Sequence, residues 1–187
     1  MSAVSAPFGF RPAYNPIGLE RAKKYAVASG YGTAMYKGQP CILNTNGTVT
    51  VGTAAADLLG ILAGFEFTDA SGKPNLQTFW PAGQTTQSSL VATAWVYDDP
   101  NEVYEVQADG SVAQAGIGDQ ADVSNVGNNQ LGLSTCTLNS TLAGAGVQAQ
   151  FRIVGFGQQL DNAPGDAFTI VQVQLARSQY ISNKVAI

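Results

Sequence analysis

The chain has 187 residues, enough for one hydrophobic core or for two small lobes. Hydrophobic residues make up 45%, which excludes wholesale disorder, whereas charged residues make up only 12%, about half the usual share. The sequence has no histidine, so it lacks the commonest general base and the commonest transition-metal ligand.

The charges are distributed unevenly along the chain. Residues 1–37 carry five basic residues and one acidic residue, a net charge of +4, while residues 38–150 carry one basic and ten acidic residues, a net charge of −9. An acidic body of this kind repels phosphate, so nucleic acid is not an expected partner. The asymmetry instead predicts that the basic leading segment of one chain faces the acidic body of a neighbour.

Residues 1–33 are predicted to form an extended N-terminal arm. Proline and glycine recur here too often for a helix or a central strand. The segment nevertheless contains large apolar side chains, including Phe8, Phe10 and Tyr14, which a disordered tail normally lacks. We therefore expect the arm to dock, either on its own body or, as we favour, across a subunit boundary.

From residue 34 onward the pattern changes to short strands separated by turn residues. Ten segments have the alternation or the apolar composition of strands: 34–45, 48–51, 59–68, 77–80, 90–97, 102–108, 120–124, 132–138, 148–158 and 167–175. No segment sustains the periodicity of a helix. The predicted fold is therefore all-β, with little helix: a compact β-barrel or sandwich body of about ten short strands over residues 34–187. The sequence is compatible with a body built around one core and with a body of two small lobes, 34–97 and 98–187.

Two dipeptides predict tight hairpins. Asn46–Gly47 lies between two strand segments, and a two-residue turn there places Ile42 opposite Val51. Asp109–Gly110 similarly predicts that the strand 102–108 turns back through residues 111–115. This second hairpin belongs to the stretch 96–123, which holds seven of the thirteen acidic residues and no lysine or arginine.

The acidic turn that precedes this hairpin is the one part of the sequence where a catalytic site or an ion-binding site could be expected. Paired carboxylates cleave glycosidic bonds, and the oxygens of four residues in the turn are of the type that Ca²⁺ prefers: Asp98, Asp99, Asn101 and Glu102. The spacing of these residues matches neither template. The two cysteines lie in apolar or threonine-rich runs, which predicts buried free thiols. We therefore expect no catalytic residues, no metal, no cofactor and no enzymatic activity.

The first residues lack the apolar run of a signal peptide, and no window approaches the ~20 apolar residues that a membrane helix needs. The sequence therefore predicts a soluble protein, made in the cytoplasm, without a membrane partner.

Several short motifs follow one another along nearly the whole chain. They are APFGFRPAY at 6–14, YKGQP at 36–40, DDPN at 98–101, YEVQADG at 104–110, GIGD at 116–119, RIVG at 152–155 and GDAF at 165–168. In this order they resemble the head decoration (cement) proteins of tailed bacteriophages. None of the motifs is catalytic, and the resemblance lies in their succession.

The resemblance implies a structural virion protein, made in the host cytoplasm and located on the capsid exterior. It would bind the outer surface of the head and stabilise contacts between major capsid protein subunits, with neighbouring copies of itself arranged as a homotrimer. The arm would reach onto the capsid or a neighbouring protomer, and the acidic turn would contact a basic surface. The expected interface residues are Phe8, Phe10, Arg11, Tyr14, Asp98, Asp99 and Glu102.

Three alternatives remain open from the sequence. One is a fibre or tail component of the same kind of virion. Another is a carbohydrate-binding β-sandwich, for which Trp80, Trp95 and Tyr97 would offer stacking faces. The third is a calcium-dependent hydrolase that uses the acidic turn.

Overall fold

A computed structural model describes residues 2–128 and 132–181 of the chain. Within these residues the fold consists of fifteen strands and two short 3₁₀ helices, Gln87–Ser89 and Gln114–Gly116, which confirms the predicted all-β class. Each of the ten predicted segments contains a strand. Three strands were not predicted: β1 (Arg11–Tyr14) and β2 (Ala22–Val27) lie in the expected arm, and β7 (Pro74–Gln77) shares only its last residue with the predicted segment 77–80. No helix of the described part is long and apolar enough to cross a membrane.

The first sheet is built mainly from the N-terminal half of the chain. Its order is β2-β9-β6-β4-β5, and β7 also pairs with β6. The bounds are β2 Ala22–Val27, β4 Pro40–Leu43, β5 Val49–Val51, β6 Gly60–Thr68, β7 Pro74–Gln77 and β9 Ala92–Tyr97. A bridge between Ala26 and Thr48 connects the two ends of this order, so the sheet curls towards a barrel around its own core. The short pair β3 (Met35–Tyr36) and β8 (Phe79–Trp80) packs beside it.

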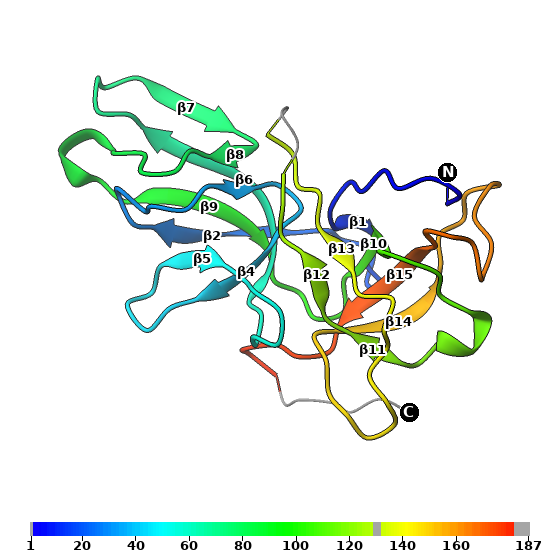
Figure 1. Cartoon of the computed structure of the whole chain (residues 1–187). Coiled ribbons are helices and arrows are strands. Elements are labelled where there is room, and N and C mark those ends of the chain that lie inside the picture. Colours follow the sequence, from blue (N-terminus) through cyan, green and yellow to red (C-terminus); the bar gives the residue numbers. More distant parts are fainter. Residues whose placement is uncertain (1, 129–131, 182–187) are drawn as a thin grey trace.

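The second sheet contains the C-terminal strands and one strand from the N-terminus. Its order is β1-β10-β15-β14-β11 (Figure 1). The bounds are β1 Arg11–Tyr14, β10 Val103–Gln107, β11 Gln120–Ala121, β14 Phe151–Phe156 and β15 Ile170–Leu175, with a separate pair β12 (Val123–Asn125) and β13 (Thr137–Leu138). The core of this half also takes Leu58 and Ile61 from the first half, so the two halves pack against each other.

The expected arm is corrected by this arrangement. Strand β1 pairs with β10 and strand β2 pairs with β9, so the segment 1–33 supplies a strand to each of the two sheets of its own chain. Phe10 is only 2% exposed, and its ring stacks on that of Phe151 at 4.4 Å between centroids. The segment joins the body because its apolar side chains complete a core that the later strands leave open.

The hairpin predicted at Asp109–Gly110 is wrong. Residues 111–115 form no strand, and neither Asp109 nor Gly110 has the positive φ that a two-residue turn requires. The backbone N–H of Asp109 instead donates to the carbonyl of Leu138 at 2.9 Å, and the Asp109 carboxylate accepts the N–H of Ser140 at 2.8 Å. Contacts with a segment about thirty residues away in sequence therefore replace the local turn.

The hairpin at Asn46–Gly47 is confirmed, but its predicted register is wrong by one residue. Ile42 lies opposite Thr50 rather than Val51. The N–H of Asn44 donates to the carbonyl of Thr48 at 2.9 Å, so the loop is longer than two residues. A longer loop shifts the pairing of the strands that it joins.

Candidate functional site

The acidic turn lies where the chain passes from the first sheet to the second, between β9 and β10. The carboxylate of Asp98 accepts hydrogen bonds from Lys23 Nζ at 2.9 Å and from the hydroxyl of Tyr25 at 2.6 Å. Both donors belong to β2, and Asp98 is only 5% exposed. Burial, followed by the hydrogen bond to Asp98, raises the pKa of Tyr25, so the hydroxyl stays a donor.

Asn15 connects the other two carboxylates of the turn. Its Nδ2 donates to Asp99 Oδ2 at 3.0 Å and to Glu102 Oε2 at 2.8 Å. Its Oδ1 accepts the N–H of Ile17 at 3.0 Å, and its carbonyl accepts the N–H of Gly18 at 2.8 Å. One buried side chain thus holds the loop that follows β1 against the acidic turn.

The two carboxylates bound by Asn15 have opposite pKa shifts. Burial raises the pKa of Glu102 above its usual value, and the nearby charges of Glu20 and Asp99 add to the shift, against the hydrogen bond from Asn15. Burial also acts to raise the pKa of Asp99, but hydrogen bonds from Asn101 and Asn15 outweigh it and lower the pKa overall.

For Asp98 and Glu102, these contacts correct the expectation that the acidic turn faces a neighbour. Asp98 and Glu102 are 5% and 1% exposed, and their hydrogen-bond donors come from residues 15–25 of the same chain. The complementarity between a basic leading segment and an acidic body is therefore satisfied within one molecule. Both residues serve to attach that segment to the body.

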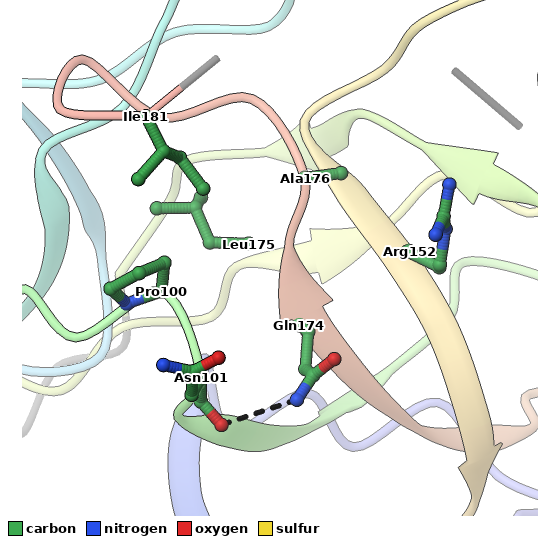
Figure 2. Close-up of a pocket in the computed structure, with 7 residues that line it drawn as sticks. All are labelled: Pro100, Asn101, Arg152, Gln174, Leu175, Ala176 and Ile181. Atoms are coloured by element: carbon green, nitrogen blue, oxygen red, sulfur yellow. Dashed lines mark hydrogen bonds between the residues drawn. The ribbon is translucent and has the colours of Figure 1, made fainter. Parts of the chain in front are cut away.

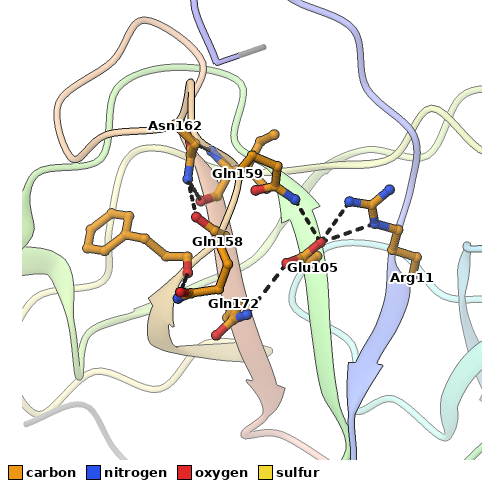
Figure 3. Close-up of polar contacts among 9 residues, drawn as sticks. Arg11, Glu105, Gln158, Gln159, Asn162 and Gln172 are labelled. Carbon is orange, nitrogen blue, oxygen red and sulfur yellow. Dashed lines mark hydrogen bonds and ion pairs between the residues drawn. The ribbon is translucent and has the colours of Figure 1, made fainter.

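On the second sheet, Arg11 of β1 likewise connects the N-terminal segment to the body, through a carboxylate of the neighbouring strand β10 (Figure 3). Its Nε and Nη2 donate to Glu105 Oε2 at 3.2 and 2.7 Å, and its guanidinium lies 4.4 Å from the centre of the Phe8 ring. Glu105 also accepts a hydrogen bond from Gln159 at 3.1 Å. The Arg11 side chain is 53% exposed, so this pair contributes little to stability but remains accessible at the surface.

Residues 14–19, which we call the 14–19 loop, present large apolar side chains to solvent. Tyr14 is 48% exposed, Ile17 71% and Leu19 61%. Pro16 restricts the backbone, and the contacts of Asn15 fix the turn, so these side chains project from a constrained loop. Ile17 and Leu19 are apolar residues of the same proline-rich segment as Phe10, and no local feature of the sequence separates them from Phe10, which is buried.

The aromatic residues considered for carbohydrate stacking lie in three different environments. Trp80 is fully buried beside Phe67, with ring centres 5.1 Å apart, which excludes it as a stacking face. Tyr97 packs against the core of the second half. Trp95 is half-buried on the outer face of the first sheet, with Lys24 Nζ 4.7 Å from its ring centre.

A surface pocket of about 350 Å³ lies beside the end of β15 (Figure 2). Gln174 Nε2 donates to the carbonyl of Asn101 at 3.2 Å across it. The lining residues are Pro100, Asn101, Arg152, Gln174, Leu175, Ala176 and Ile181. None of these described side chains carries a carboxylate, thiol or hydroxyl, so they supply neither a nucleophile nor a general base.

Both cysteines are buried free thiols, as predicted. Burial raises the pKa of the Cys136 thiol to about 12, and that of Cys41 further still, so neither is a reactive thiolate at neutral pH. Within the described residues no group of three or more cysteines and carboxylates could hold a metal ion.

A scan against protein-family models finds no match to this chain, and searches of curated proteins and of solved structures find none either. The arguments for function therefore come from the residues and contacts of the chain itself.

Proposed function

We propose that this protein is a structural virion protein that binds the outside of a tailed-bacteriophage head and stabilises contacts between major capsid protein subunits. The observation that carries the proposal is the 14–19 loop, where Tyr14, Ile17 and Leu19 are exposed on a constrained segment. The succession of short motifs that resembles head decoration proteins supports the same function. In this proposal the protein binds and does not catalyse, and its location is the capsid exterior.

The 14–19 loop has the properties of a docking element. Full burial of an apolar side chain of this size contributes about 1.5–3 kcal/mol. Because Asn15 and Pro16 already fix the loop, little conformational entropy remains to be lost when it docks. On a capsid the same contact is repeated over the lattice, so modest contacts between neighbouring subunits add up to stable binding.

The interface residues expected from the sequence are revised accordingly. Tyr14 and the partly exposed pair Phe8 and Arg11 remain candidates for contact with the capsid. Asp99, which is partly exposed, also remains a candidate. Phe10 does not, because it is buried in the core, and Asp98 and Glu102 do not, because they are buried within the chain.

The test is co-sedimentation of the full chain with expanded heads and with compact proheads assembled from the major capsid protein encoded in the same genome. We expect binding to expanded heads and little binding to proheads. The double variant Ile17→Asp, Leu19→Asp should weaken binding by roughly tenfold to hundredfold for each side chain. Point changes are preferable to deletion of the segment, because β1 is part of the second sheet.

The matched control is the double variant Val147→Asp, Leu160→Asp, which adds the same charge at two other exposed apolar positions. It should bind heads like the wild-type chain. Equal binding by the loop variant and the control would contradict the role of the loop. Failure of the wild-type chain to bind expanded heads would contradict the proposed function itself.

A further inference from the structure

The outer face of the first sheet carries a second exposed apolar surface, separate from the 14–19 loop. It is formed by β2, β9, β6 and β7, of which β7 lies at the end of the molecule away from the second sheet (Figure 1). Trp95 lies at its centre, opposite Lys24 on one neighbouring strand and Gly64 on the other. We call this the Trp95 face. It is lined by Ala22, Lys24, Ala63, Gly64, Glu66 and Leu76, in addition to Trp95.

The Trp95 face combines a projection with a hollow. Leu76 projects from β7 and is 80% exposed. Directly beside it, the small residues Ala22, Ala63 and Gly64 leave a hollow of about 450 Å³ next to the indole of Trp95. A leucine that is exposed to this extent beside an apolar hollow is typical of a surface that a partner covers.

The charges on the Trp95 face are balanced. Its lining includes one cation, Lys24, and one anion, Glu66, whose charged atoms are 3.7 Å apart. Both side chains are more than half exposed. The face is therefore neutral on a chain whose net charge is −4, and it does not select a strongly charged partner. A second copy of the same face offers an anion for each cation.

We propose that the Trp95 face is a two-fold interface between two copies of this chain, in which Leu76 of each copy enters the hollow beside Trp95 of the other. A two-fold contact requires a surface that complements itself, and here the projection, the hollow, the cation and the anion lie side by side on one face. A three-fold ring requires two complementary surfaces turned away from each other. The homotrimer expected from the resemblance would thus use a different surface.

The proposal goes beyond the proposed function and does not depend on it. Self-association uses the Trp95 face, whereas head binding uses the 14–19 loop. The variant Leu76→Asp should therefore abolish self-association, and the variant Ile17→Asp, Leu19→Asp should retain it. The opposite pattern is expected for binding to heads, so failure of one proposal is distinguishable from failure of the other.

The first measurement is sedimentation velocity of the full chain over a range from about 1 to 500 μM, which covers the affinity of weak protein–protein contacts. We expect a concentration-dependent equilibrium between monomer and dimer. Because each residue occurs twice in a two-fold interface, a change that costs tenfold per site costs about hundredfold in the dimer dissociation constant. Leu76→Asp should be monomeric throughout, and Leu160→Asp, which alters an exposed leucine elsewhere, should dimerise like the wild-type chain.

The decisive measurement uses the charge pair. Lys24→Glu gives a face with two anions and Glu66→Lys gives a face with two cations, so each variant alone should dimerise more weakly than the wild-type chain. An equimolar mixture of the two should restore dimers, all of them mixed, because the cationic face meets the anionic one. Both positions are exposed, so the variants should fold normally, which circular dichroism would check.

Three results of these association measurements would overturn the proposal: a wild-type chain that is monomeric up to about 500 μM, an assembly that is trimeric and insensitive to Leu76→Asp, and a mixture that associates no better than its components. Binding on a glycan array that is lost in Trp95→Ala would also overturn it, because the hollow would then be a carbohydrate site.

Discussion

Replacement of Phe10 by alanine gives the sharpest test of whether the N-terminal segment belongs to the body. Phe10 is 2% exposed, and its ring stacks on Phe151 with an interplanar angle of 21°. Loss of the buried ring removes about 1.5–3 kcal/mol of transfer free energy, and the aromatic pair adds about 0.5–1.5 kcal/mol. Including the cavity that remains, the substitution should lower the free energy of unfolding by about 3–5 kcal/mol.

A loss of this size is a large part of the 5–15 kcal/mol that is typical of folded proteins. For a chain of this length it corresponds to a decrease in melting temperature of roughly 6–20 °C. Equilibrium denaturation in urea measures the difference directly. Tyr14→Ala is the matched control, because Tyr14 ends the strand β1 that begins directly after Phe10, but it is 48% exposed and should change stability by less than about 1 kcal/mol.

The two variants also distinguish a docking arm from a structural strand. If the segment were a free arm, Phe10→Ala would leave the free energy of unfolding unchanged and would affect binding alone. A difference from the wild-type chain below about 1 kcal/mol, similar to that of Tyr14→Ala, would therefore refute the assignment of Phe10 to the core.

Three further predictions concern the acidic turn and the glycines beside β1. Because burial raises the pKa of Glu102, its ionisation in the folded state costs stability as the pH rises through that pKa. Glu102→Gln should therefore be more stable than the wild-type chain at pH 7, and pH-dependent denaturation curves should show that this advantage disappears below about pH 4. No gain in stability at pH 7 would contradict the prediction. Asp98→Ala leaves the hydroxyl of the half-buried Tyr25 without its acceptor, while the exposed ammonium of Lys23 turns to water, so the change should cost about 1–3 kcal/mol in urea denaturation. Asp57→Ala, at a site whose side chain is 46% exposed, should cost less than about 1 kcal/mol. Equal losses would contradict the burial of the Asp98 carboxylate. Gly9 and Gly18 both have positive φ, but an added Cβ at Gly9 would lie 2.8 Å from the Cβ of Ser134, whereas the space around Gly18 is open. Thermal melts should therefore show that Gly18→Ala lowers the free energy of unfolding by about 1–2 kcal/mol and that Gly9→Ala lowers it further.

The sequence by itself determined the fold class and the position of most strands. Alternation of apolar side chains and turn-forming residues act over a few neighbours, so segments such as 59–68 and 167–175 could be recognised as strands without knowledge of their partners. The burial of both cysteines followed in the same way, from their immediate surroundings.

The candidate site was predicted less well, because it depends on contacts between distant segments. Asn15 and Glu102 are separated by 87 residues in the sequence, and Arg11 and Glu105 by 94. Composition indicated that a basic segment and an acidic body complement each other, but it could not show that both belong to one molecule. The prolines and glycines near β1 suggested an arm outside the body, because local composition does not show that this segment pairs with a strand about ninety residues away.

Only the tertiary structure decided which apolar residues of the N-terminal segment are inside and which are outside. Phe10 and Ile17 have similar hydrophobicity and both lie near proline, yet one is 2% and the other 71% exposed. The difference arises because β1 pairs with β10, which directs Phe10 into the core of the second half, while Asn15 holds the following loop at the surface. Pairing across about ninety residues is a property of the whole fold, and no local pattern encodes it.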